Sequence, residues 1–346
     1  MSHERCSKCI LSGAFPGLKF DDDGVCNFCR DEMLFTTEKE IIASSKVKIE
    51  KLIEELKGKT RYDAVVCFSG GKDSTYTLQM AVKEYGLKVL SFTLDNGFLA
   101  PEALANINKI VANLDVDHIT VRPASGFFNS VIKATALNPI YSPKSLTRIS
   151  SGCNSCISLV NITALRLALQ LEAPFIIAGF TLGQIPVNAV MFKNNYRFLE
   201  ESREPILEKL TGHVGNRLDD YFRIEDKLLD NVKQYPTNLN LLCLKDLSED
   251  EIVEGIKPLG WERPTGVDGC SSNCQLNTFN NYIHEKQFGY NPYELELSHL
   301  IRKGQMSRQE ALLKVKDQPI EQLNSIMNKL EITQQELDEG HYPSNQ

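Results

Sequence analysis

One six-residue segment has the residue types and order of a phosphate-binding loop: Ser69-Gly70-Gly71-Lys72-Asp73-Ser74. It follows a short apolar run at residues 64–68 and precedes a stretch with helical character. The two glycines allow the backbone to approach a ligand closely, and the free N–H groups at a helix start attract an anion. Lys72 adds a positive charge, and the Asp73 carboxylate is suited to holding Mg²⁺ between phosphates.

A second group with chemical potential is the N-terminal cysteine pattern Cys6-x2-Cys9-x16-Cys26-x2-Cys29. Four thiolates in two tight pairs complete the closed tetrahedron of a structural zinc site. The segments between the pairs are too short to form a core of their own, so bound metal would supply the folding free energy. The pattern favours a structural Zn²⁺ site, with a redox or sulfur-carrying role as the alternative.

A third group consists of Cys153-x2-Cys156, at the start of an expected helix, and Cys270-x3-Cys274 far downstream. Paired cysteines in a reducing compartment indicate metal or redox chemistry rather than disulfides. The four thiols suit a second zinc ion, three of them suit a 4Fe-4S cluster with one open iron, and a thiol site without metal is a further alternative. Cys67 and Cys243 are expected to be small core residues.

Apolar runs and helical stretches alternate through the first half of the chain, which predicts a parallel β-sheet covered by helices on both faces. Strands are expected at 64–68, 88–94, 118–121 and 175–179. Beyond about residue 185 the alternation fades, and helices are expected, three of them starting at the capping-box patterns of Ser248, Ser307 and Thr333. The expected organisation is a zinc module at 1–34, a linking helix at 35–60, a nucleotide-binding domain at 61–235, and a helical region at 236–346 that returns Cys270 and Cys274 to the active site.

The composition is that of a globular protein, with 42% hydrophobic residues and 24% charged residues in 346. The net charge of −7 argues against a partner made mainly of phosphate backbone. No run of about 20 apolar residues stands out, and the N-terminus lacks the apolar core of a signal peptide. We therefore expect a cytoplasmic protein with no membrane partner.

The loop at 69–74 resembles the PP-loop motif of ATP pyrophosphatases. This resemblance implies an α/β fold and an enzyme that cleaves ATP to AMP and pyrophosphate, adenylating a substrate oxygen with the help of Mg²⁺. It assigns ATP binding to all six loop residues and catalysis to Lys72 and Asp73. It also places adenine and ribose near Thr93 and Asp95 at the second strand end, with Gly179 completing the site.

The two ends of the chain resemble one PP-loop subfamily, the N-acetyl sugar amidotransferases of surface-polysaccharide synthesis. The shared segments are Cys6–Ile10, Phe15–Gly17, Asp23–Cys29 and Leu297–Met306. Those enzymes use ammonia to convert an acetamido group to an amidine. This resemblance implies an amidotransferase supplied with ammonia by a glutaminase partner.

The middle of the chain resembles the 4Fe-4S tRNA thiolation enzymes, through Gly152–Cys156, Ala178–Gln184 and Arg203–Ile206. This resemblance implies that Cys153 and Cys156 bind the cluster with Cys270, or Cys274 in its place, as third ligand. The remaining cysteine, expected to be Cys274, would then be catalytic. The family has His where this chain has Phe180, and an acid pair where it has Gly183-Gln184. A general base is therefore missing from that position, and Lys144, Arg148 and Arg203 are the other candidates.

Together these patterns predict an ATP-dependent sulfurtransferase that replaces a carbonyl oxygen by sulfur. A small molecule such as a nucleobase is favoured as acceptor over tRNA, and the sulfur donor would be a cysteine desulfurase or free sulfide. The relatives suggest a homodimer. The sugar amidotransferase, a tRNA thiolation enzyme and a non-catalytic nucleotide-binding regulator are the alternatives.

Overall fold

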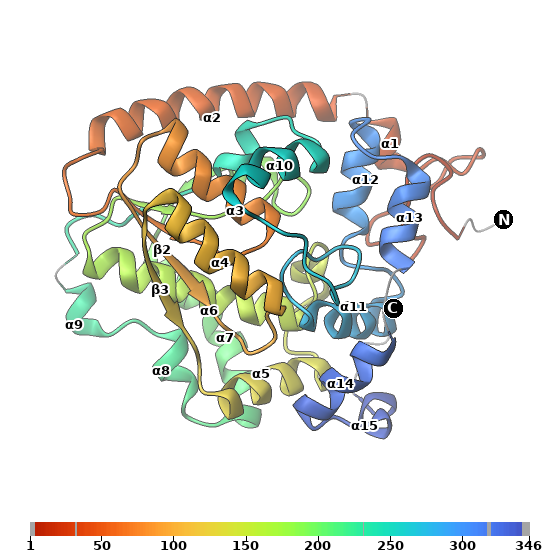
Figure 1. Cartoon of the computed structure of the whole chain (residues 1–346). Helices are drawn as coiled ribbons and strands as arrows, with labels where there is room; N and C mark the ends of the chain where they lie inside the picture. Colours follow the sequence, from red (N-terminus) through yellow and green to blue (C-terminus); the bar gives the residue numbers. More distant parts are fainter. Residues whose placement is uncertain (1–3, 32, 231, 317–319, 341–346) are drawn as a thin grey trace.

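The computed structural model describes residues 4–31, 33–230, 232–316 and 320–340, and its centre is a six-stranded sheet (Figure 1). The strand order is β3-β2-β1-β4-β6-β5. All neighbouring pairs are parallel except β5 with β6. The strands are β1 (Ala64–Cys67), β2 (Val89–Leu94), β3 (Asp117–Val121), β4 (Phe175–Ile177), β5 (Met191–Lys193) and β6 (Thr237–Leu239).

The residues of β1 alternate between two apolar layers, as a strand buried on both faces requires. Ala64 and Val66 belong to the cluster formed with α2, α3, α4 and α10, whereas Val65 packs with α6 on the opposite face. The helices of the first layer are α2 (Leu34–Leu56), α3 (Lys72–Gln79), α4 (Pro101–Leu114) and α10 (Glu249–Ile256). The predicted α/β class, with helices on both faces of a mostly parallel sheet, is confirmed.

The other face and the lower end of the molecule are covered by helices α5 to α9, joined by the C-terminal α14 and α15 (Figure 1). These are α5 (Ser125–Leu137), α6 (Ser151–Gln170), α7 (Tyr196–Val214), α8 (Leu218–Phe222), α9 (Asp226–Leu229), α14 (Ile320–Leu330) and α15 (Gln334–Asp338). The remaining helices are α1 (Asn27–Arg30), α11 (Leu276–Phe288), α12 (Glu294–Arg302) and α13 (Arg308–Lys316).

The four predicted strands are present, but β5 and β6 were not predicted. Each has only three residues, too few for a periodic pattern to stand out. Complete capping boxes are present at Ser248 and Thr333. At Ser307 the side chain accepts the Glu310 N–H at 3.1 Å, which confirms a helix start there as well.

The first and last parts of the chain lie side by side, with the N-terminal segment against α12 and α13 (Figure 1). Arg5 Nη1 pairs with Glu294 Oε1 at 2.6 Å, and the Ile10 N–H donates to Ser298 Oγ at 3.3 Å. Arg308 Nε donates to the Cys9 carbonyl at 2.8 Å. The N-terminal cysteine segment is therefore packed onto the helical region that ends the chain.

Among the described residues one helix, Ser151–Gln170, has the length and apolar composition that would permit a membrane span. A helix in a protein core meets the same criteria. Here Ile162, Leu165 and Ala168 of this helix are buried in the layer that contacts β1.

Candidate active site

The loop at residues 69–74 connects β1 to α3, with Gly71 at the N-cap of the helix. Gly70 has φ +75°, and a Cβ at this position would lie 2.4 Å from the Ala103 carbonyl oxygen. The Gly70 carbonyl accepts the Trp261 indole N–H at 3.0 Å. Glycine is therefore required by both backbone conformation and close packing, and the helix N-terminus faces the loop. Strand, loop and helix have the arrangement expected of a PP-loop α/β protein.

Lys72 and Asp73 form an ion pair of 2.8 Å, and both side chains are largely shielded from solvent. Burial acts to lower the pKa of Lys72, but the nearby carboxylates of Asp73 and Glu249 more than compensate, so its pKa is raised. Lys72 is thus held as a cation at the start of α3. The pair supplies one positive and one negative group where the phosphates of a nucleotide would lie.

The segment 268–275 reaches back to the phosphate loop from the C-terminal region. Ser272 Oγ accepts the Lys72 N–H at 3.2 Å. The Ala100 N–H donates to the Asn273 carbonyl at 2.9 Å, and the Gln275 N–H donates to the Phe98 carbonyl at 2.9 Å. These bonds attach the segment to the loop that follows β2, so the two halves of the chain meet at the site.

Cys153, Cys156 and Cys274 come together beside this junction. Asn96 Nδ2 lies 3.7 Å from Cys156 Sγ and 3.6 Å from Cys274 Sγ. Asn280 Nδ2 donates to Cys153 Sγ at 3.1 Å. Burial raises the pKa of all three thiols, and the charges of Cys274 and Cys153 contribute to the rise at Cys156. The three sulfurs therefore share one environment with amide donors around it.

Cys270 points elsewhere, which revises the choice made from sequence. Its thiol lies 3.7 Å from the Lys314 carbonyl, and the charged groups that act on it are Asp268, Glu296, Lys314 and Lys72. Cys274 is therefore a better candidate than Cys270 for the third partner of Cys153 and Cys156. The physical reason is the backbone pairing of residues 273–275 with 98–100, which turns Cys274 toward Asn96.

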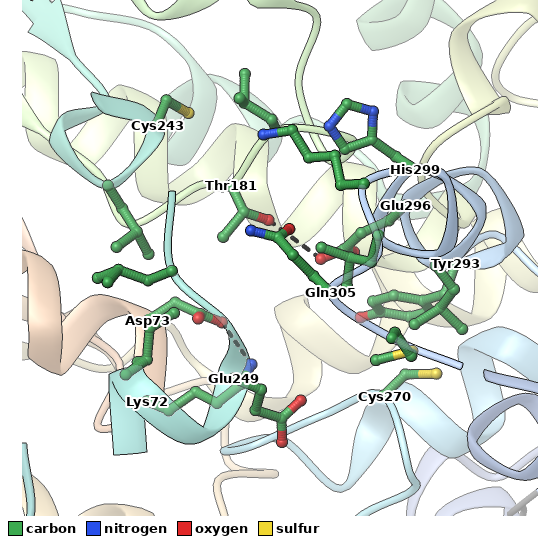
Figure 2. Close-up of a pocket in the computed structure, with 18 of the residues that line it drawn as sticks. Lys72, Asp73, Thr181, Cys243, Glu249, Cys270, Tyr293, Glu296, His299 and Gln305 are labelled. Atoms are coloured by element: carbon green, nitrogen blue, oxygen red, sulfur yellow. Dashed lines mark hydrogen bonds and ion pairs between the residues drawn. The ribbon is translucent and has the colours of Figure 1, made fainter. Parts of the chain in front are cut away.

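A pocket beside the phosphate loop, which we call the lysine pocket, brings Cys270 together with Lys72, Asp73, Thr181, Tyr293 and Glu296. Figure 2 shows Glu296 and Thr181 on one side of this pocket and the Lys72–Asp73 pair on the other. Thr181 Oγ1 donates to Glu296 Oε1 at 3.1 Å. The pocket is small, about 80 Å³, so it holds a reacting group rather than a whole ligand.

Glu296 is the functional candidate that the sequence analysis missed. Burial raises its pKa to about 7, even though the Lys72 charge acts in the opposite direction. A carboxyl group with a pKa near neutrality, in a pocket with a phosphate loop, is suited to general acid–base catalysis. Its position in α12 follows the pattern of an ordinary amphipathic helix, so only the fold reveals that it faces the site.

The earlier base candidates lie outside this pocket. Lys144 is exposed, and Arg203 packs near Tyr141 and Tyr196. Arg148 donates from Nη1 to the Gly183 carbonyl and lines a different pocket. Gly183 has φ +99°, and a Cβ there would lie 2.9 Å from Glu296 Cα. Gly183-Gln184, in the loop after β4, stand where the thiolation enzymes have an acid pair. Glu296 of α12 lies beside this position.

The residues predicted near the nucleotide lie around the ends of β1, β2 and β4. Thr93 Oγ1 donates to the Phe68 carbonyl at 2.5 Å, and Asp95 pairs with Arg122. Gly179 is required by packing, because a Cβ there would lie 2.8 Å from Ser74 Cα. Ser69 and Ser74 hydroxyls are 3.1 Å apart within the loop. These contacts stabilise the loop and strand ends, and direct roles toward a nucleotide remain predictions.

The four N-terminal cysteines converge, with all four Sγ atoms within 4.8 Å of one another. Cys9 Sγ and Cys26 Sγ are 3.8 Å apart. A tetrahedral zinc ion with Zn–S bonds of about 2.3 Å requires sulfurs roughly 3.8 Å apart, which fits this group. The N–H groups of Lys8, Cys9 and Cys26 donate to Cys6 Sγ at distances of 3.3 to 3.4 Å.

A known family matches the C-terminal end of the chain. Residues 268–343 match the model of the C-terminal domain of WbpG-like LPS biosynthesis proteins. This stretch includes Cys270, Cys274 and Glu296. It overlaps the region where the sequence resembles sugar amidotransferases of surface-polysaccharide synthesis, and it agrees with that resemblance.

Three further proteins are similar to the chain. The uncharacterized protein MJ1599 of Methanocaldococcus jannaschii is 24% identical over 218 residues, 60% of this chain and 73% of that protein. The U34-tRNA thiolase NcsA of Methanococcus maripaludis, solved with its [4Fe-4S] cluster, has 14% identity and a TM-score of 0.35, with 88% of each chain covered. NMN synthetase of Francisella tularensis has 13% identity and a TM-score of 0.39, covering 86% of this chain and 97% of that one. Both scores are too low to carry an inference about activity.

Proposed function

We propose that this protein is an ATP-dependent enzyme that adenylates an amide or lactam oxygen of a small molecule and replaces that oxygen by sulfur. One observation carries the proposal: the phosphate loop, an acid with a pKa near 7 and three convergent cysteines meet where residues 268–275 join the sheet. Each of these suits a different step of one reaction. A phosphate loop alone would be equally consistent with a nucleotide-binding regulator.

The first step in this scheme is nucleotide activation. The acceptor oxygen attacks the α-phosphorus of ATP, the α–β P–O bond breaks, and pyrophosphate leaves. The N–H groups at Gly71 and the start of α3 and the Lys72 cation offset the charge that develops on the departing pyrophosphate. Asp73 is the residue placed to hold Mg²⁺ between the phosphates. The product of this step is an acceptor with AMP as a good leaving group.

The second step needs a nucleophile and a base. Hydrosulfide attacks the activated carbon, the C–S bond forms, and the C–O bond to AMP breaks. Glu296 is placed to accept the proton that the acceptor nitrogen or the nucleophile releases. Its pKa of about 7 allows it to be ionised before the step and protonated after it.

The three inner cysteines are the proposed ligands of a 4Fe-4S cluster. The amide of Asn96 contacts two of their sulfurs. The three inner Sγ atoms do not all lie within 4.8 Å of one another, as the four N-terminal Sγ atoms do. This wider spacing fits a cluster, whose irons separate the ligands, better than one ion. When bound, the cluster would hold sulfide near the activated carbon. For the N-terminal group we propose a structural zinc ion.

Nitrogen transfer is the second candidate function. The match of residues 268–343 to WbpG-like LPS biosynthesis proteins favours it, because the sequence ends resemble amidotransferases of surface-polysaccharide synthesis. The adenylation step would be the same, and ammonia would replace hydrosulfide. In that case Glu296 would accept the proton that ammonia loses on attack.

The test is to purify the full chain without oxygen, determine zinc and iron, and measure the products of ATP cleavage with sulfide or ammonia present. Sulfur transfer predicts iron bound by Cys153, Cys156 and Cys274 and pyrophosphate release that depends on sulfide. If the protein contains no iron and its pyrophosphate release depends on ammonia, sulfur transfer is rejected and nitrogen transfer is supported. Orthophosphate as the sole phosphate product would reject adenylation in both forms.

A further inference from the structure

A second and larger pocket adjoins the lysine pocket along α12. Its volume is about 400 Å³, within the range of roughly 300–1,000 Å³ that small-molecule sites occupy. Leu295, His299 and Arg302 line it, spaced so that they share one helix face. We call it the arginine pocket; Phe28, Arg148 and Gly183 complete the part of its wall used below.

The arginine pocket is lined by an arginine whose guanidinium group is only partly hydrogen-bonded within the described residues. In the described part of the chain, Arg302 Nε and Nη1 are buried and have no hydrogen-bond partner. Two acidic residues also line the pocket: Glu38, which pairs with Lys303 at 3.4 Å, and the exposed Asp31, which accepts the Met33 N–H at 3.1 Å. Buried guanidinium N–H groups without an acceptor are costly, so this arrangement indicates a missing acceptor. Phosphate and carboxylate groups match the guanidinium geometry best.

The two pockets are close neighbours. His299 lines both of them. At Gly183, which lines the arginine pocket, a Cβ would lie 2.9 Å from the Cα of Glu296, which lines the lysine pocket. The backbones of Gly183 and Glu296 are therefore in contact between the two pockets. A molecule in the larger pocket lies next to the proposed general base.

The N-terminal cysteine module also contributes to the arginine pocket. Phe28 lies between Cys26 and Cys29, and its ring packs edge-on against Phe15 at 6.0 Å between centroids. The apolar side chains of Phe28 and Leu295 line the pocket and would contact an uncharged portion of a ligand. A metal held by the four cysteines would fix this wall, so the module has a role beyond its own folding.

From these observations we propose that the arginine pocket binds the acceptor, and that the acceptor is an amide or lactam bearing a phosphate or carboxylate group that pairs with Arg302 and Arg148. This proposal rests on the proposed function, because the amide is the group that Glu296 would serve. It adds the location of the acceptor and its charge. The net charge of the protein, which is −7, gives no hint of such a site.

The test compares two probes that differ by one charged group, N-acetylglucosamine 1-phosphate and N-acetylglucosamine. Binding is measured by calorimetry on the full chain with the phosphate loop saturated by α,β-methylene-ATP, which blocks the other anion site. The wild type should bind the phosphate probe at least about tenfold more tightly. Arg302→Gln should remove most of this preference. The control is Arg217→Gln, which changes an exposed arginine at the N-cap of α8 and should leave the preference intact. Crystals soaked with the phosphate probe should show its phosphate at Arg302.

Equal binding of the two probes, or a preference that survives Arg302→Gln, would overturn the proposal. So would probe phosphate located outside the arginine pocket. Cys29→Ser should weaken probe binding while α,β-methylene-ATP still binds, and that second ligand reports whether the variant is folded. Because probe binding needs no ATP cleavage, a protein that binds the probe but releases no pyrophosphate would reject the proposed function separately.

Discussion

The two cysteine groups of this protein differ in the spacing of their sulfur atoms and in the groups that contact them. The N-terminal four are packed until every sulfur lies within 4.8 Å of the others, with backbone N–H groups directed at Cys6. The inner three are more widely spaced and are contacted by the side-chain amides of Asn96 and Asn280. The first arrangement matches one tetrahedral ion, and the second leaves room for a larger group or for free thiols.

This difference shows that spacing along the chain does not decide what a cysteine group does. Cys6-x2-Cys9 and Cys153-x2-Cys156 have identical spacing. The first pair meets its partners through a short loop, whereas the second starts a helix and depends on Cys274, which arrives from more than 100 residues away. The function of each pair follows from what the fold brings beside it.

The largest effect is expected from removing Cys274, the third cysteine of the inner group. Cys274→Ala should abolish iron binding and product formation, because it removes one of the three convergent sulfurs. Cys270→Ala should keep the iron, because its thiol points toward the Lys314 carbonyl. Iron determination and Mössbauer spectra on anaerobic protein measure this. Equal iron in both variants would show that the inner cysteines are not ligands.

The next largest effect is expected at Glu296. We propose that this residue acts at the inner site and has no role in the N-terminal cysteine group. Glu296→Gln should lower the rate of product formation by about 10² to 10⁴, the usual contribution of general acid–base catalysis. In the wild type, kcat/KM should rise with pH to a plateau above about 7, since the base form must be ionised. In the variant this rise should be absent.

A stability measurement distinguishes catalytic loss from unfolding in this variant. The folded pKa of Glu296 lies above its ordinary value, so the carboxyl favours the folded state when protonated, and this contribution is lost as pH rises toward 7. Glu296→Gln should therefore be at least as stable as the wild type at pH 8. A lower melting temperature there would assign the residue a structural role instead.

The third prediction concerns the outer group. Cys26→Ser should remove zinc and lower the free energy of unfolding by about 4 kcal/mol or more, as loss of a structural metal does. The affinity for an ATP analogue should change little, because the phosphate loop is built by β1 and α3. Zinc content, melting temperature and nucleotide binding measured together check this. A large loss of nucleotide affinity in folded protein would link the outer group to the inner site.

The smallest effect is expected for Asn96, the residue whose amide reaches both Cys156 and Cys274. Asn96→Ala removes two long hydrogen bonds to the sulfurs, each of which contributes about 1 kcal/mol at most, and the bond from the Phe98 N–H to Asn96 Oδ1 at 2.9 Å. Product formation should fall by less than about thirtyfold, and bound iron should be kept. Complete loss of iron would mean that the amide, and not the three sulfurs alone, holds the site together.

The sheet and the phosphate loop could be predicted because their signals are local. The apolar run before Ser69 and the glycines within the loop act through neighbouring backbone, so strand, turn and helix follow from the sequence. The same holds for the four N-terminal cysteines, whose two pairs are close in the chain. The capping boxes at Ser248 and Thr333 are local for the same reason.

The rest of the site depends on contacts between distant segments. Cys270 and Cys274 have similar sequence surroundings, and only the pairing of residues 273–275 with 98–100 separates their roles. Glu296 lies in a helix with several other acidic and apolar residues, and nothing along the chain marks it as facing Lys72. Burial by residues from α3 and the loop after β4 raises its pKa, and such burial cannot be read from a single sequence.

The backbone bonds that join residues 273–275 to 98–100 also set an order of events during synthesis. The nucleotide half of the molecule leaves the ribosome first and can form its sheet, but Cys156 then waits for Cys274 to emerge. Until residue 274 has emerged, Cys153 and Cys156 have no third partner, and Glu296 of α12 emerges later still. In the proposed reaction the second step, which involves Cys274 and Glu296, therefore requires residues that are synthesised long after the phosphate loop.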